Sequence, residues 1–117
     1  MTVPSSLIPE FDQEMATTRR LLERVPDDKG TWKPHPKSFP LGHLAQLIAG
    51  MPGWQTHTLR GTDLDLATFP GYTCETTATL LEGFDRNVRT AREAFVTAKD
   101  ADFEVPWSLR HGAQVFF

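Results

Sequence analysis

Apolar residues recur along this chain at the spacing of an α-helix, and they predict three helices. The first helix is expected to begin near Pro9, because proline is tolerated in an opening turn, where its missing N–H would have no partner. It should stop at Pro26 and the two aspartates that follow. One face of its 3.6-residue period is formed by Phe11, Met15, Leu22 and Val25.

The second helix is expected to have Ser38 as its N-cap and Pro40 in its first turn. Pro52 falls inside the apolar pattern that follows. It should kink the helix and not end it, because the spacing continues through Trp54 and Leu59. The broad apolar face of this helix comprises Leu41, Leu44, Ala45, Leu47, Ile48, Met51 and Trp54.

The third helix is predicted over residues 76–98. Gly83 lowers its helix propensity by about 1 kcal/mol relative to alanine, which suggests that another helix approaches closely at this position. The apolar face of the third helix comprises Leu80, Leu81, Phe84, Val88, Ala91 and Phe95.

Two segments lack a helical pattern. Residues 61–72 are rich in turn residues and are predicted to be a connector. Residues 103–117 begin with alternating apolar and polar positions and contain a His111-Gly turn signal, so they predict a short hairpin or an extended tail. We find no internal repeat, so residues 1–117 are expected to form a single domain. Its predicted fold class is an all-α helical bundle with three main helices.

Composition excludes several classes of function. The net charge is −3 and the isoelectric point is about 5.7, which gives no basic surface for nucleic acid. The single cysteine, Cys74, excludes an internal disulfide and a cysteine-pair metal motif. The N-terminal residues lack a basic region followed by a long apolar run, and no segment is long enough to span a bilayer. We therefore expect a cytoplasmic protein without membrane partners.

The four histidines, His35, His43, His57 and His111, are the first candidates for metal chemistry. A zinc-type site needs three or more ligands about 2.0–2.2 Å from one ion. His43 and His57 would lie about 21 Å apart along a straight helix, so they do not share an ion within one chain. No local histidine-pair motif occurs either. We expect no intrachain metal site, and His43, His35 and His111 remain the candidates if one exists.

No pattern identifies a catalytic residue. The serines lack the G-x-S-x-G context of a hydrolase nucleophile, and no glycine-rich phosphate loop occurs. Trp54 and Trp107 have two interpretations, as core residues or as the lining of a small apolar pocket, and core packing is the commoner use. If a pocket forms, we expect it near His43 and Leu47.

Several segments together resemble a known superfamily. The first three are residues 10–15 (Glu-Phe-Asp-Gln-Glu-Met), 21–26 (Leu-Leu-Glu-Arg-Val-Pro) and 32–38 (Trp-Lys-Pro-His-Pro-Lys-Ser). With residues 41–45, 51–54, 80–87 and 106–110, they make the chain similar to the DinB-like superfamily. The resemblance implies a four-helix bundle, often dimeric, and the activity of a metal-dependent hydrolase or thiol transferase.

The resemblance also implies three histidines that bind a divalent metal, typically nickel, zinc or iron. One belongs about nine positions after Ser38, where this chain has Leu47. His43 lies one turn earlier on the same face, so it substitutes only if the ion moves by about 5–6 Å. The other two belong to a final helix that should follow a segment like residues 115–117, and no residue here matches them. We expect the fourth helix to be missing and one copy not to assemble this site.

Three hypotheses follow. The leading one is a DinB-like domain of unknown specific function without the metal site, in which a homodimer covers the apolar faces that a fourth helix would cover. The second is a metal-dependent hydrolase or transferase whose divalent ion is bound across a homodimer by His35, His43 or His111. The third is a helical protein-interaction module. The sequence does not indicate a small-molecule substrate.

Overall fold

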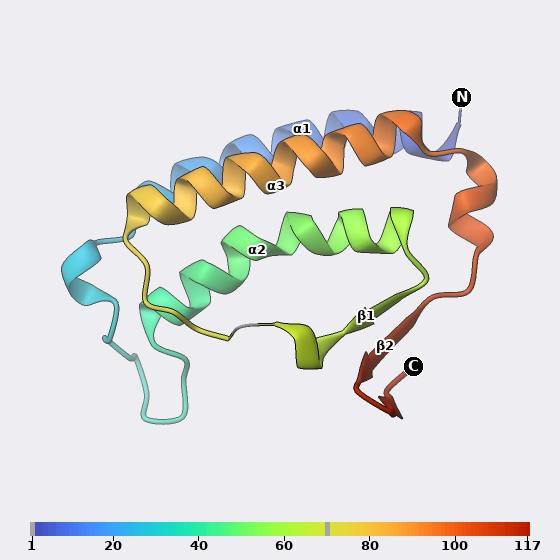
Figure 1. Ribbon diagram of the computed structural model, residues 1–117. Helices are drawn as coiled ribbons and strands as arrows, with labels where there is room; N and C mark the ends of the chain where they lie inside the picture. The colour runs from blue at the N-terminus through green and yellow to red at the C-terminus, as the bar shows by residue number, and fades with distance from the viewer. Residues whose placement is uncertain (1, 70) are drawn as a thin grey trace.

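The computed structural model describes residues 2–69 and 71–117 and contains three long helices (Figure 1). They are α1 (Val3–Leu22), α2 (Leu41–Arg60) and α3 (Thr77–Thr97). Figure 1 shows α1 and α3 lying alongside each other, and α2 lies below both of them in this view. The shorter elements are the 3-10 helices η1 (Asp27–Lys29), η2 (Leu66–Thr68) and η3 (Asp100–Glu104) and the strands β1 (Asp63–Asp65), β2 (Ser108–His111) and β3 (Gln114–Val115).

Helix α1 begins at Val3, so the prediction that it starts near Pro9 is wrong. Thr2 is the N-cap, and its hydroxyl accepts a hydrogen bond from the Ser5 backbone N–H at 3.2 Å. The Ser5 hydroxyl in turn accepts from the Thr2 N–H at 3.0 Å. This reciprocal capping pairs two N–H groups that a helix start otherwise leaves open, and the helix continues through Pro9.

Helix α2 begins at Leu41. Its N-cap residue is Pro40, whose side chain forms no capping hydrogen bond. The prediction of Ser38 as the N-cap is therefore wrong. The carbonyls of the preceding loop perform the capping instead. The Leu41 N–H donates to the Trp32 carbonyl, and the Gly42 N–H donates to the Gly30 carbonyl, both at 2.9 Å.

Beyond this start, α2 continues through Pro52 to Arg60, as the apolar spacing predicts. Figure 1 shows the helix bending partway along its length. Only part of its apolar face is buried: Ala45 and Ala49 are in the core, whereas Leu44 is 43% exposed and Met51 is 48% exposed. The predicted apolar face of α2 is therefore buried at its small residues and partly buried at Ile48, which packs against the core.

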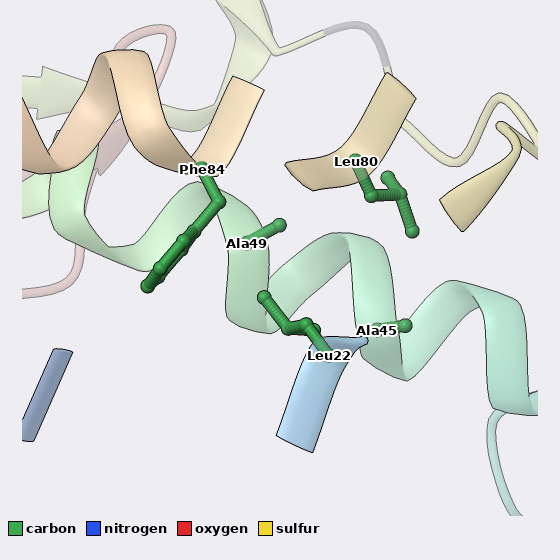
Figure 2. Close-up of a cluster of buried hydrophobic side chains, with 5 residues drawn as sticks. All are labelled: Leu22, Ala45, Ala49, Leu80 and Phe84. Carbon is green, nitrogen blue, oxygen red and sulfur yellow. The ribbon is translucent and has the colours of Figure 1, made fainter. Parts of the chain in front are cut away.

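Helix α3 matches its predicted span to within one residue at each end and packs against both α1 and α2. Figure 2 shows the larger core cluster where the three helices meet. Phe84, only 1% exposed, is at its centre. The cluster consists of Leu22 of α1, Ala45 and Ala49 of α2, and Leu80 and Phe84 of α3.

A second cluster joins α1 to the C-terminal half of α3. Phe11 and Phe95 pack with their ring centroids 5.2 Å apart, beside the fully buried Ala91.

Gly83 has a different environment from the one its sequence position suggests. A Cβ atom there would meet only the Arg86 side chain, at 3.7 Å, so no second helix approaches closely at this glycine.

The mainly helical prediction is confirmed, and a small sheet is present in addition. Strand β1 pairs with β2 in parallel, with Asp63 opposite Ser108, and β2 pairs with β3 in an antiparallel hairpin. The hairpin form of the tail is confirmed, but part of the predicted connector is strand β1. The parallel pairing joins segments on either side of α3, and local periodicity carries no signal for such a contact. The molecule is mainly helical with one three-stranded sheet.

The sequence also predicts no segment that spans a membrane. Across residues 2–69 and 71–117, no helix combines the length and the apolar character required to cross a membrane.

Candidate functional site

A cavity of about 320 Å³, partly open to solvent, lies against α2 and is also lined by η2 and the segment before α3. Its volume is at the lower end of the range for small-molecule sites. No Asp, Glu, Lys or Arg is among the described residues that line it. These residues are His43, Gln46, Leu47, Gly50 and Trp54 of α2, Leu66 of η2, and Phe69, Gly71 and Tyr72.

The helical repeat of α2 places four of the lining residues on one face. His43, Leu47, Gly50 and Trp54 follow one another at intervals of 4, 3 and 4 residues. Over the 11 intervals from His43 to Trp54 a straight helix rises about 16 Å. A Cβ atom added to Gly50 would meet nothing within 4 Å, so this glycine leaves an open depression in the middle of the floor.

Gln46 fixes the opposite wall of the cavity to α2. Its Nε2 donates to the Gly71 carbonyl at 2.9 Å. Its Oε1 accepts from the Thr73 backbone N–H at 3.0 Å and from the Thr73 hydroxyl at 3.3 Å. A single amide side chain therefore binds three polar groups of residues 71–73 and holds this wall of the cavity against α2.

The Tyr72 side chain packs against the loop at Gly30 and against the start of α2 at Gly42. Its hydroxyl would lie 2.4 Å from a Cβ atom on Gly42, so only glycine fits at that position. The hydroxyl is buried and has no hydrogen-bond partner among the described residues. The adjacent Cys74 thiol, together with burial, raises the pKa of the Tyr72 phenol above its usual value, although the thiol does not reach hydrogen-bonding geometry.

Aromatic contacts bound the two ends of the cavity. At one end the His43 ring stacks on Tyr72 with centroids 5.0 Å apart and planes 8° from parallel. Phe39 also contacts His43, at 4.3 Å between centroids. At the other end Trp54 packs against Phe69 at 6.3 Å. These contacts restrain the orientation of the His43 and Trp54 rings.

The structure brings together three of the residues that the sequence proposed for a pocket. His43, Leu47 and Trp54 line the same cavity, whereas Trp107 is not among its described lining residues. Trp107 precedes β2 and is half-buried, and its indole N–H is buried without a hydrogen-bond partner in the described chain.

The remaining histidines lie elsewhere. His35 is exposed in the loop before α2, where its Nδ1 accepts a hydrogen bond from the Lys37 N–H at 3.1 Å. His57 is exposed near the end of α2, and His111 is exposed at the end of β2.

The described residues do not fit the metal centre that the DinB-like resemblance implies. Within residues 2–69 and 71–117, no three His, Cys, Asp or Glu side chains gather as potential ligands. At the position expected for the first ligand, Leu47 contributes an apolar side chain to the cavity floor. A leucine supplies no donor atom for a divalent ion.

Several lining residues were missed from the sequence. Leu66, Phe69 and Tyr72 belong to the segment that was interpreted only as a connector. The available signal was two aromatic residues within four positions, around Pro70 and Gly71. Solvated turns rarely need two large aromatic rings, so these residues indicate packing against a neighbouring element.

A second cavity, of about 300 Å³, lies between α1 and α3, but its charges neutralise one another. Arg19 forms a two-point ion pair with Asp85 at 2.9 and 3.0 Å, and this pair lowers the pKa of Asp85. Nearby, Arg92 pairs with Asp12 in the same way. These ion pairs join α1 to α3, so the second cavity is best explained as part of the packing between the two helices.

Comparison of the chain with protein-family models, with curated proteins and with solved structures found no match in any of the three.

Proposed function

We propose that this chain is a DinB-like domain that binds a small, uncharged, mainly apolar molecule and lacks the metal chemistry that the resemblance implies. The observation that carries this proposal is the cavity of about 320 Å³ with no charged residue among its described lining residues. Apolar walls with few polar groups are the usual composition of small-molecule sites.

The DinB-like part of the proposal rests on the sequence resemblance and is compatible with the mainly helical architecture. The segments that carry the resemblance lie in α1, in the loop before α2, in α2 itself, in α3 and around the start of β2. In this proposal the cavity floor at Leu47 takes the place of the first metal ligand, so the site keeps its position and changes its chemistry.

Gly50 provides the test of binding. The probe is toluene, titrated into isotope-labelled protein while backbone amide shifts are recorded by NMR. We expect shifts clustered on α2 and on residues 66–72. Gly50→Phe should abolish them, because its ring would fill the cavity, whereas Gly50→Ala should retain them, because an added Cβ meets nothing within 4 Å. Equal binding by all three proteins, or no binding by any, would contradict the proposal.

The absence of metal chemistry has its own test. Purified protein is incubated with nickel or with zinc, separated from free ions and subjected to elemental analysis. We expect less than one ion for every two chains. One ion per two chains, lost on His43→Ala, would instead support the hydrolase or transferase with a site between subunits.

A second candidate function, protein interaction, is supported by a different observation. Leu44 and Met51 are exposed on α2 beside the cavity, and Phe116 and Phe117 are exposed at the end of the chain. Leu44 and Met51 are seven residues apart and so share one face of α2, and exposed apolar side chains gathered on one face favour an interaction surface. The partner we propose is a second copy of the chain.

A further inference from the structure

The polar groups around the cavity are not equally available to a ligand. Gln46 already uses its Nε2 and Oε1 to hold Gly71 and Thr73. The Tyr72 hydroxyl lies within 2.4 Å of the Cβ position of Gly42 and 3.7 Å from that of Gly30, so it points into the packing beside α2. Tyr72 therefore directs no polar group into the cavity, and Gln46 retains only its second Nε2 N–H.

His43 and the Trp54 indole N–H are the further polar groups in the described lining, and of the two only His43 can also accept a hydrogen bond. Its ring is held against Phe39 and Tyr72, and its nitrogens make no hydrogen bond to any described residue. A neutral imidazole carries one donor and one acceptor, both on the ring edge. The stacked arrangement therefore leaves a single edge for hydrogen bonding at one end of the cavity.

The rest of the lining favours an aromatic, uncharged molecule. Trp54 and Phe69 supply aromatic surface at the far end, and Leu47 and Gly50 leave an apolar floor between the two ends. An anion or a cation entering this space would lose water without gaining an opposite charge, because no Asp, Glu, Lys or Arg is among the described lining residues.

We infer that the ligand class of this cavity is a neutral aromatic molecule whose one polar group hydrogen-bonds to His43. The inference rests on the proposed function and adds the chemistry of the ligand. The rings lie over Leu47 and Gly50 and towards Trp54, and a hydroxyl or carbonyl group meets the His43 edge. His43 is then the residue that determines specificity.

The test uses two probes with the same ring system, 2-naphthol and naphthalene-2-sulfonate. Both are titrated into the wild-type protein and into His43→Phe, which retains an aromatic ring and removes both nitrogens. We expect the wild type to bind 2-naphthol more tightly than the sulfonate. The variant should bind 2-naphthol about 3- to 10-fold more weakly, which corresponds to one net hydrogen bond. Toluene, which has no polar group, should bind both proteins equally.

The outcomes separate the two proposals. If toluene binds in the cavity but 2-naphthol does not, or if the sulfonate binds equally well, the ligand class is wrong and the binding function stands. If His43→Phe leaves the affinity for 2-naphthol unchanged, the role of His43 is wrong. If none of the three probes shifts the amides of α2 and residues 66–72, both proposals fail.

Discussion

Gly42 shows how one residue fixes the start of α2 against two neighbouring segments. Its backbone N–H donates to the Gly30 carbonyl at 2.9 Å, and a Cβ atom at this position would lie 3.2 Å from Gly30 Cα and 2.4 Å from the Tyr72 hydroxyl. Capping of the helix by the loop therefore requires a residue without a side chain. The same contact sets the position of Tyr72, which forms a wall of the cavity.

Gly42→Ala is expected to destabilise the protein by about 1–3 kcal/mol, the usual range for overpacking. Tyr72→Phe alone should cost almost nothing or stabilise, because it removes a buried hydroxyl that has no partner among the described residues. The double variant should recover part of the loss, since the phenylalanine lacks the closest clashing atom. Urea unfolding of the four proteins measures this coupling, and strictly additive effects would show that the contact is absent.

Phe84 and Trp54 differ in how deeply their side chains are buried. Phe84 is 1% exposed at the junction of the helices, so Phe84→Ala should lower the free energy of unfolding by about 3–5 kcal/mol. Trp54 is half-buried and faces the cavity, so Trp54→Ala should lower it by less. Calorimetry compares the two variants. A larger loss at Trp54 would mean that the cavity is filled by packing.

At the scale of elements, the helices were predictable and the sheet was not. The third helix was predicted closely because its apolar period is uninterrupted and Thr76 caps it. The start of α1 was misplaced because Pro9 was used as a boundary signal, and the start of α2 because Ser38 was taken as the N-cap. Hydrogen bonds at Thr2 and from the loop before α2 decide where each helix begins. In α2, apolar character did not distinguish the side facing the core from the side facing the cavity.

The candidate site was predictable in part for the same reason. Residues on α2 share a face by periodicity, so His43, Leu47 and Trp54 could be grouped from the sequence. The opposite wall comes from Phe69 and Tyr72, and its position depends on the hydrogen bonds made by Gln46. A contact between a helix and a distant connector has no periodic signature.

Asp65 connects the small sheet to its hairpin turn. Its carboxylate accepts from the Gly112 and Ala67 N–H groups at 2.8 and 3.0 Å and pairs with Arg110 at 3.0 Å. The two backbone hydrogen bonds, aided by Arg110, lower the pKa of Asp65. Because this pKa is depressed in the folded state, the stabilisation is complete above the unfolded value of about 3.9 and is lost as the pH falls through the folded value.

Asp65→Asn should therefore be less stable than the wild type at neutral pH, and the difference should shrink as the pH is lowered below about 4. Urea unfolding at pH 7 and at pH 3 measures it. Asp28→Asn, in η1, serves as a matched control, because the exposed Asp28 carboxylate forms no ion pair and accepts no hydrogen bond among the described residues. A constant difference across this pH range would assign the effect of Asp65→Asn to geometry and not to charge.

At the scale of the whole molecule, the proposed homodimer is tested through the exposed residues of α2. Analytical ultracentrifugation of the wild type should give a dimer. Leu44→Lys combined with Met51→Lys should give a folded monomer, because both side chains are nearly half exposed and lie outside the buried core. Leu21→Lys, on α1, is the control, since Leu21 is 63% exposed on a different helix. A monomeric wild type, or equal disruption by the control, would exclude α2 as the dimer surface.

The parallel pairing of β1 with β2 has a consequence for the order of folding. The contact between Asp63 and Ser108 encloses all of α3, so the chain must close a long loop before this pair is stabilised. Packing around Phe84 also joins distant segments, since Leu22 meets Leu80, but it buries large apolar side chains, whereas β2 and β3 have no buried residue. Helix packing should therefore come first, and the sheet should form last. The same hierarchy governs opening. Amide hydrogens in β2 should exchange with solvent well before those in the middle of α3, and the C-terminal end of the protein should be its first site of proteolysis.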